Sequence, residues 1–551
     1  MPNTSDATAR LIRHLVARND ETITRTLARQ RRDPAAPVLG AVDNAHGIPT
    51  AQDTARLIIA LACAVHSPDS RWHRDPALNE PLDLATAALV KLQHADGTID
   101  LVETNFHSTP DTAFVLEIIT AAAQLLRGAD RPDHAAARTA LETFIRRGGG
   151  ALVAGGVHTP NHRWVVCGAL ARVHALYPDS RYLDRVDQWL AEGIDLDPDG
   201  QYTEKSTGVY SPVVNRALLG AARLLNRPEL YEPVRRNLAM TLYYVHPDGE
   251  LVTEASRRQD QYQRVHLSRY YMGYRAMALH DGDGRFAAAA RYIEQSAPDD
   301  LAGELATFFE EPEWQAELPP GTALPTDYAR VFAHSHLARI RRDELSATIL
   351  ARNPTLFSLR KGHAALEAVR LASAFFGKGQ FEAEELEIAD GVYRLRQRLE
   401  GPYFQPLPPE RIEPGAPVRM APNGTLAVDE PNARATSEVQ VLESVVEVRE
   451  RAGGFTLDFT VTGTDHVPVA IELAFRAGGQ LTGVTPVAGT TDAFMLAGDT
   501  GTYTAGGDVI TFGPGRAENR YTQLRGARPK WAGQSVYLTG STPFHARLEL
   551  G

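Results

Sequence analysis

The sequence is poor in cysteine and has no long apolar run, and both absences limit what the protein can be. It contains only 2 cysteines in 551 residues. Cys63 and Cys167 lie within apolar helical patterns, so we expect two reduced core residues rather than a disulfide or a catalytic pair. No uninterrupted apolar run approaches the roughly 20 residues that a membrane-spanning helix needs. Residues 1–20 are polar and then amphipathic, without the apolar segment of a secretory signal, which predicts a cytoplasmic protein.

Motifs for common metal and nucleotide sites are also missing. The chain has no HExxH, no CxxC, no P-loop and no GxGxxG between a strand and a helix. His334 and His336 form a pair without a third ligand nearby, so we expect no metal there. The net charge of −11 gives no support for a nucleic-acid partner, although local basic clusters can still bind an acidic ligand. We expect no cofactor and no membrane partner, and nothing in the pattern predicts an oligomeric state.

The chain divides into a part with helical sequence patterns and a part with strand patterns. Apolar residues are 43% and charged residues 23% of the sequence, as in an ordinary globular protein, and the length predicts two or three domains. Up to residue 345 the apolar spacing is helical, with a clear stripe over 114–126. Asp-Gly pairs end helices at residues 96–97, 199–200 and 248–249. Repeated helix–turn–helix units predict an antiparallel helical array, either a closed ring or a solenoid.

The remainder, residues 346–551, is rich in strand patterns. Residues 444–463 alternate with period two around a Gly-Gly pair, which predicts a hairpin. Further stretches of this kind with Gly-rich turns predict an antiparallel sheet or sandwich. Residues 401–424 are Pro-rich, which predicts a loop. The pattern of residues 361–377 fits either a helix or the edge of a sheet. We therefore predict an α+β protein with a helical domain at 1–345 and a β domain at 346–551.

Polar and aromatic residues gather at helix ends between His158 and Tyr271. Asn161 and His162 follow Pro160, at a helix start whose free N–H groups favour anions. There Asn161 can donate to a carboxylate, and His162 can move a proton near neutral pH. The alternative is that Asn161 caps the helix and His162 is a solvated residue of the first turn.

A second group of candidates follows the turn at residues 199–200. A tyrosine such as Tyr210 acts as a base only if nearby cations lower its pKa, and Lys205, Arg163 or Arg257 can supply them. The alternative is that the tyrosines pack at the rim with their hydroxyls in water. Around 251–275 the arginines favour carboxylate or sulfate binding, with a surface ion-pair network as the alternative. The candidate substrate-binding residues are His107, Arg163, Tyr202, Glu204, Lys205, Arg257, Arg258, Tyr262, His266 and Tyr270.

This arrangement resembles the heparinase II/III-like and alginate-lyase group of polysaccharide lyases. The resemblance rests on the helical repeats, the Asn161–His162 pair, the later Asp-Gly turn with Glu, Ser and Tyr, and the C-terminal β domain. It implies an (α/α) toroid followed by antiparallel sheets, with the active site in the cleft between them. It also implies that Asn161 neutralises the uronate carboxylate and that Tyr210 is the catalytic tyrosine. The family's His-x-His-x-Asp signature is missing, which leaves His363 as a stand-in for its β-domain histidine.

Three hypotheses follow for the function. The first is a lyase that cleaves a uronate-containing oligo- or polysaccharide by β-elimination, with Asn161, His162 and Tyr210 as catalytic residues. The second is a glycoside hydrolase acting on glucuronides or unsaturated uronides with a carboxylate pair. Its candidates are Glu204, Asp111, Asp199, Glu254 and Asp260, although Asp111, after Pro110, also suits a helix cap. The third is a non-catalytic glycan-binding protein.

Overall fold

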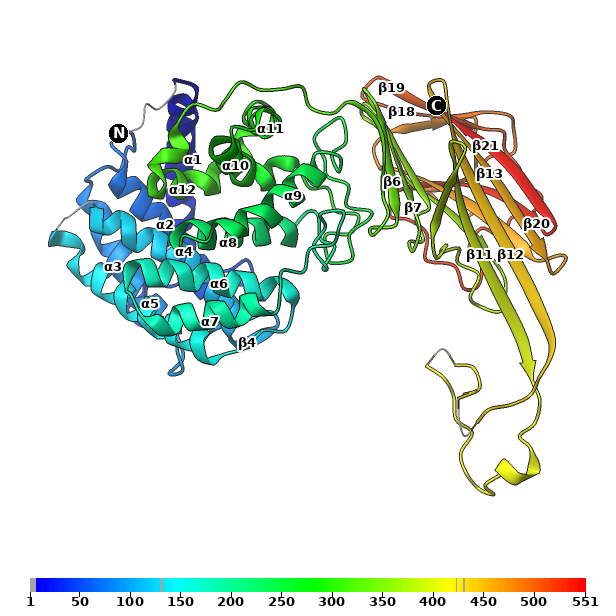
Figure 1. Ribbon diagram of the computed structural model, residues 1–551, viewed down its shortest axis with the longest axis horizontal. Helices are drawn as coiled ribbons and strands as arrows, with labels where there is room; N and C mark the ends of the chain where they lie inside the picture. Colours follow the sequence, from blue (N-terminus) through cyan, green and yellow to red (C-terminus); the bar gives the residue numbers. More distant parts are fainter. Residues whose placement is uncertain (1–5, 129–131, 423, 430–431) are drawn as a thin grey trace. The chain divides into compact units, whose positions relative to one another are not determined.

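The computed structural model describes residues 6–128, 132–422, 424–429 and 432–551 (Figure 1). The chain forms two compact units. The helical unit consists of the chain up to residue 245 together with 249–325, and the β unit consists of 246–248 and 326–551. The first unit therefore ends about 20 residues before the boundary drawn from the sequence at 345, because β5 and β6 already belong to a sheet. Their arginine-rich pattern (residues 327–342) hides the period-two alternation of a strand.

Amphipathic helices build the first unit. Those in its described part are α1 (Asp6–Leu27), α2 (Ala51–His66), α3 (Asn79–Leu92), α4 (Thr109–Gly128), α5 (Ala135–Ala154), α6 (Pro160–Leu176), α7 (Ser180–Ala191), α8 (Tyr210–Leu224), α9 (Tyr231–Thr241), α10 (Tyr271–Asp281), α11 (Gly284–Ser296) and α12 (Leu305–Glu310). The stripe predicted on α4 is buried at Val115, Ile119, Ala122 and Leu126. Two short hairpins, β1–β2 (Val42–Asp43, Pro49–Thr50) and β3–β4 (Ile99–Leu101, Asn105–Ser108), lie between the first helices.

Alternate helices form an inner ring. α2, α4, α6 and α8 pack against one another in succession, as Figure 1 shows for α4, α6 and α8. α3, α5, α7 and α9 each pack against the inner helix that precedes them. α12 returns to contact α2 and α4, so the helical array closes into a toroid. Among the described residues, no helix is long and apolar enough to cross a membrane.

The predicted Asp-Gly turns are confirmed by backbone geometry. Gly97, Gly200 and Gly249 have φ values of 87°, 97° and 82°, which suit glycine because it has no Cβ. At Gly97 space is also tight, because an added Cβ would lie 2.2 Å from the carbonyl oxygen of Arg147. The two cysteines are free and buried, as predicted.

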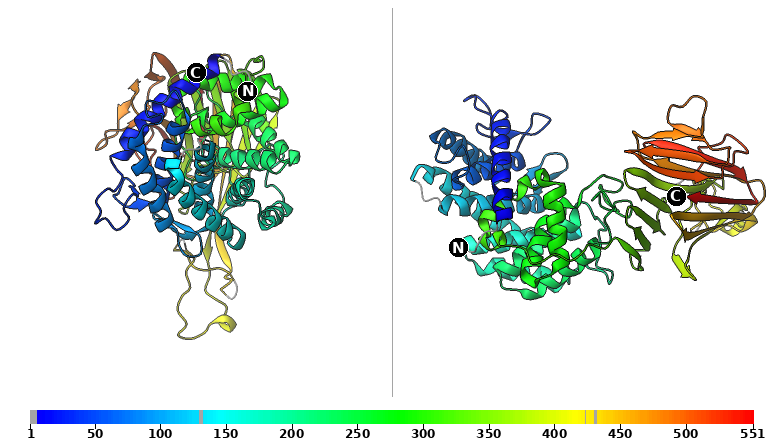
Figure 2. Two further views of the ribbon diagram at one scale, coloured as in Figure 1. Left: turned by 90° about the vertical axis from the view of Figure 1, so that its left-hand side faces the viewer. Right: turned by 90° about the horizontal axis from the view of Figure 1, so that it is seen from above.

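Two antiparallel sheets build the second unit, which Figure 2 shows from two further sides. One sheet has the order β16 (Thr485–Pro486), β17 (Ala493–Met495), β20 (Gln534–Ser541), β14 (Pro468–Phe475), β9 (Ala364–Ser373), β8 (Phe357–Lys361), β7 (Leu345–Leu350), β6 (Leu337–Arg342) and β5 (Asp327–Phe332). The other has the order β10 (Leu386–Ala389), β11 (Val392–Phe404), β12 (Thr436–Arg451), β13 (Gly454–Gly463), β21 (Phe544–Leu550), β19 (Asp508–Gly513), β18 (Gly501–Ala505) and β15 (Gln480–Thr482). Among the strands of the described residues, the short pairing of β17 with β20 is parallel and the other strand pairings are antiparallel.

One apolar core joins the two sheets into a sandwich. Side chains of both sheets meet in it, as where Phe357 packs on Phe455 with ring centroids 5.3 Å apart. The hairpin predicted at 444–463 is confirmed as β12–β13, with Arg451 paired to Gly454. The ambiguous segment 361–377 contains β9, which lies inside its sheet between β14 and β8 rather than at an edge. Burial on both faces explains why its alanines carried no alternating pattern.

Candidate active site

Asn161 lies in the first turn of α6 with its side chain buried. The N-cap of this helix is Thr159, so the capping role considered for Asn161 is wrong. Its amide nitrogen Nδ2 donates to Oε1 and Oε2 of Glu204, at 2.8 and 2.9 Å, and lies 3.1 Å from Oγ1 of Thr159. Its oxygen Oδ1 is buried and has no hydrogen-bond partner among the described residues. The side chain is thus held with its donor turned toward a carboxylate.

Glu204 is the centre of this contact and is itself only 8% exposed. It follows the turn at Gly200, which brings the loop back toward the start of α6. Arg258 approaches from a later loop, with Nη1 3.6 Å from Oε1 of Glu204. A buried carboxylate is costly unless it is paired and hydrogen-bonded, and Asn161 and Arg258 supply these contacts.

Tyr210 joins the same group through Arg258. It is the first residue of α8, and the guanidinium carbon of Arg258 lies 4.9 Å from the centroid of its ring. The Tyr210 hydroxyl accepts a hydrogen bond of 2.7 Å from Nε2 of Gln259. The contacts from Asn161 through Glu204 and Arg258 to Tyr210 are therefore continuous, and we call these four residues the polar cluster.

His162 lies beside the polar cluster and is buried, so it is not a solvated residue of the first turn. Its ring stands edge-on to that of His158, with centroids 4.7 Å apart. Burial lowers the pKa of His162 to about 4, with smaller contributions from His158 and Arg258 and an opposing one from Asp111. Nδ1 has no hydrogen-bond partner among the described residues. A neutral imidazole near pH 7 is able to accept a proton.

Hydrogen bonds to Asp260 link the loop that carries Glu204 to the loop that carries Arg258. It is 1% exposed and accepts hydrogen bonds of 2.8 Å from Oγ of Ser206, Oγ of Ser256 and the backbone N–H of Gly208. Ser206 Oγ in turn accepts from the backbone N–H of Tyr210 at 3.1 Å. The sequence suggested Asp260 only as a hydrolase carboxylate. No signal in the sequence indicated that Asp260 links two loops, because two of its donors, Ser206 and Gly208, lie 54 and 52 residues away.

Four of the predicted substrate-binding residues make structural contacts instead of joining the polar cluster. Tyr202 is buried and donates to Oδ1 of Asn215 at 2.9 Å, so its hydroxyl is not in water. Tyr270 is buried and donates to the carbonyl oxygen of Thr207 at 2.7 Å. Arg163 pairs with Asp195 and Glu192 at 2.9 and 3.1 Å, and His266 accepts from the backbone N–H of Ser268 at 3.1 Å.

The remaining predicted residues lie around the loops. Arg257 has an exposed side chain, and its backbone N–H donates to the carbonyl oxygen of Lys205 at 2.8 Å. Lys205 and Tyr262 have positive φ values, 48° and 62°, in tight loop conformations. Asp111 does not act as the cap of α4. Ser108 precedes the helix, accepts from the N–H of Asp111 at 3.2 Å and donates to its carboxylate.

His107 belongs to a separate group on the β3–β4 hairpin. Its ring stacks on that of His94 with centroids 3.8 Å apart, and Nδ1 lies 2.7 Å from Oδ2 of Asp96. In the β unit, His363 is exposed on the β8–β9 turn and pairs with Asp508 at 2.9 Å. No group of three or more His, Cys, Asp or Glu side chains in the described residues is arranged to hold a metal ion.

Comparisons with known proteins agree on the fold. No protein-family model matches the chain. No curated protein matches it by sequence either. A Paenibacillus xanthan lyase structure is similar with a TM-score of 0.57 and 10% identity, over 99% of this chain and 56% of that chain. Chondroitin AC lyase from Streptomyces coelicolor A3 is similar with a TM-score of 0.53 and 14% identity, over 99% and 82%. A heparan sulfate lyase from Pedobacter heparinus gives 0.49 and 10%, over 90% and 75%.

These matches define the class of fold. The chain has the toroid-and-sandwich fold of polysaccharide lyases, with helices first and antiparallel sheets after them. The family resemblance drawn from the sequence is confirmed at this level.

Proposed function

We propose that the protein is a lyase that cleaves a uronate-containing glycan by β-elimination at the polar cluster. The observation that carries this proposal is the continuous set of contacts from Asn161 through Glu204 and Arg258 to Tyr210. It brings an amide, a guanidinium and a phenol together at the start of two helices. The neutral His162 lies next to them.

The reaction requires these groups for separate tasks. The C5 proton of a uronate lies next to its carboxylate, and removing it leaves negative charge that spreads onto the carboxylate oxygens. Arg258 would stabilise this charge by donating to those oxygens, and so would Asn161 by exchanging its Nδ2 contact with Thr159 Oγ1 for the substrate. Tyr210 or His162 takes the C5 proton, and the glycosidic oxygen on C4 leaves with a proton from Tyr210. The C5–H and C4–O bonds break, and a double bond forms between C4 and C5.

The surroundings of the carboxylates favour elimination over hydrolysis. A glycoside hydrolase needs one carboxyl group as acid and a second as base or nucleophile. Asp260 is buried and already accepts three hydrogen bonds, and Glu204 is occupied by Asn161 and Arg258. The fold is also that of enzymes named for acidic polysaccharides, xanthan and chondroitin, the latter in complex with chondroitin sulphate. An acidic oligo- or polysaccharide is therefore the substrate class that we propose.

Uronate oligosaccharides of different linkage provide the test. Two signals are followed in parallel, the ultraviolet absorbance of the new double bond conjugated to the carboxylate, and the number of reducing ends. We expect both to rise together on at least one substrate. Reducing ends that rise without the absorbance would show hydrolysis and overturn the proposal.

A further inference from the structure

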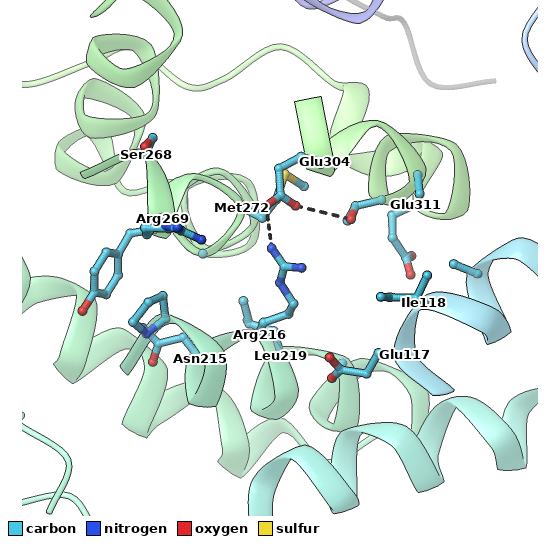
Figure 3. A pocket seen from close by; sticks show the side chains of 18 of the residues that line it. Glu117, Ile118, Asn215, Arg216, Leu219, Ser268, Arg269, Met272, Glu304 and Glu311 are labelled. Carbon is cyan, nitrogen blue, oxygen red and sulfur yellow. Dashed lines mark hydrogen bonds and ion pairs between the residues drawn. The ribbon is translucent and has the colours of Figure 1, made fainter. Parts of the chain in front are cut away.

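The toroid encloses a cavity of about 840 Å³ between its inner helices (Figure 3). Side chains from α2, α4, α6, α8, α10 and α12 line it, so it is the lumen of the ring. A volume of this order accommodates a small organic ligand such as a mono- or disaccharide. None of the described residues that line it is Asn161, Glu204, Tyr210 or Arg258. The lumen is thus distinct from the polar cluster.

Ion pairs across the lumen turn guanidinium groups toward the cavity. Arg172 of α6 pairs with Glu310 at 2.8 Å, Arg216 of α8 pairs with Glu304 at 2.5 Å, and Arg223 pairs with Glu311. In each pair the arginine side chain is the more exposed partner, most clearly for Arg216 at 50% against 13% for Glu304. Figure 3 shows the Arg216–Glu304 pair. These glutamates, of which Glu310 and Glu311 are buried and Glu304 is partly buried, compensate the charge and hold the arginines in place, which preorganises donors for a carboxylate.

Two further charged side chains, Arg269 and Glu117, lie on the wall of the lumen. Arg269 is exposed, and neither it nor Glu117 makes a hydrogen bond or ion pair with another described side chain. Burial raises the pKa of Glu117, and Glu310 acts in the same direction. Arg172 and Arg216 face it from α6 and α8 and act against that shift. Trp314 adds an apolar surface to this wall, against which a sugar ring can pack.

We propose that the lumen of the toroid binds a small sugar acid, a mono- or disaccharide with one carboxylate, at a site separate from the candidate active site. The carboxylate contacts Arg269 and the open face of Arg216, and the sugar hydroxyls bond to the paired charges around them. Arg269 contributes because its guanidinium makes no ion pair with an acid in the described part of the chain. The charge of Glu117 sets the affinity for the ligand. Its ionised form repels the ligand's carboxylate, and its protonated form donates a hydrogen bond to the ligand.

Calorimetric titration of the full chain with glucuronate tests this proposal, with glucose as the neutral probe and sulfate as the simple anion. We expect glucuronate to bind with a Kd of about 1 mM or tighter, and glucose and sulfate to bind more weakly. Arg269→Gln should weaken glucuronate binding on the order of tenfold, the effect of losing one charged contact. The matched control Arg10→Gln, at an exposed site on α1, should leave binding unchanged.

The pH dependence gives a second, independent readout. Wild-type affinity for glucuronate should increase as pH falls, because protonation of Glu117 removes a repulsive charge. Glu117→Gln should bind at least as tightly and lose this pH dependence. Equal binding by Arg269→Gln and Arg10→Gln, or no binding at all, would overturn the proposal. Binding that is lost in Asn161→Ala but kept in Arg269→Gln would place the ligand at the polar cluster instead. A failure of the proposed lyase activity leaves all these outcomes readable, because none depends on turnover.

Discussion

Asn161 and Glu204 hold each other through hydrogen bonds of 2.8 and 2.9 Å, from Nδ2 of the amide to the two carboxylate oxygens. An ionised carboxylate only accepts hydrogen bonds, so it fixes which end of the amide faces it. Glu204 therefore sets the orientation of Asn161, the residue that we propose binds the uronate carboxylate of the substrate.

Replacement of Glu204 tests this orientation. In Glu204→Gln an amide of the same size presents a donor to the Asn161 donor, so one of the two must turn. We expect a loss of about 1–3 kcal/mol in the free energy of unfolding, because buried groups lose their partners. We also expect kcat/KM to fall at least about tenfold, equal to about 1.4 kcal/mol of transition-state stabilisation. The control Glu192→Gln removes a 52% exposed carboxylate and should change neither quantity appreciably. Unchanged stability and activity in Glu204→Gln would refute the positioning role.

Asp260 should be important for stability rather than for chemistry. Its carboxylate accepts from Ser206, Ser256 and the N–H of Gly208, all at 2.8 Å. In Asp260→Asn at least one of these donors faces an NH₂ group, so urea denaturation should show a loss of about 2–3 kcal/mol. Ser256→Ala removes a single donor and should cost about 1 kcal/mol. A smaller loss in Asp260→Asn than in Ser256→Ala would contradict this account.

His162 should make folding stability depend on pH. Its pKa in the folded protein, about 4, lies below the ordinary value of 6.5. As pH falls through this range the unfolded chain binds the proton first, so the free energy of unfolding decreases between about pH 6.5 and 4. His162→Gln removes this titration. We expect its free energy of unfolding to fall less steeply than that of the wild type, by up to about 1.4 kcal/mol per pH unit. Equal slopes for the two proteins would show that His162 is not buried in its neutral form.

The glycine of the first Asp-Gly turn offers a matched comparison. Gly97 and Gly193 both have positive φ, 87° and 80°. A Cβ at Gly97 would lie 2.2 Å from the Arg147 carbonyl oxygen, whereas a Cβ at Gly193 meets no described atom within 4 Å. Gly193→Ala should therefore cost only the backbone strain, about 1–2 kcal/mol. Gly97→Ala should destabilise clearly more, as measured by thermal unfolding. Equal losses would mean that the neighbouring helix yields to the added methyl group.

Much of the fold could be predicted from local patterns. The stripe on α4, the Asp-Gly turns and the β12–β13 hairpin are each encoded within a few residues. β9 could not be assigned, because its residues are buried on both faces and the period-two signal is lost.

The candidate site was harder to predict from the sequence than the fold, and the reason is physical. Asn161 and Tyr210 stood out as polar residues at helix starts, yet Glu204 and Arg258 gain their roles from partners 43 and 54 residues away. Arg163 and Tyr202 have the same residue types as good ligands but pair with Asp195 and Asn215. Sequence pattern alone does not distinguish a side chain that faces a substrate from one that faces its own protein.

The most direct test of the central claim compares Tyr210→Phe with Tyr202→Phe on a uronate oligosaccharide that the wild type cleaves. Each variant loses one phenolic hydroxyl. That of Tyr202 is buried against Asn215, so its loss should lower stability but leave the initial rate within about threefold of the wild type, since a factor of ten corresponds to about 1.4 kcal/mol. Tyr210→Phe should remain folded and abolish the absorbance of the unsaturated product. Unsaturated product formed by Tyr210→Phe at the wild-type rate would contradict the assignment of proton transfer to Tyr210.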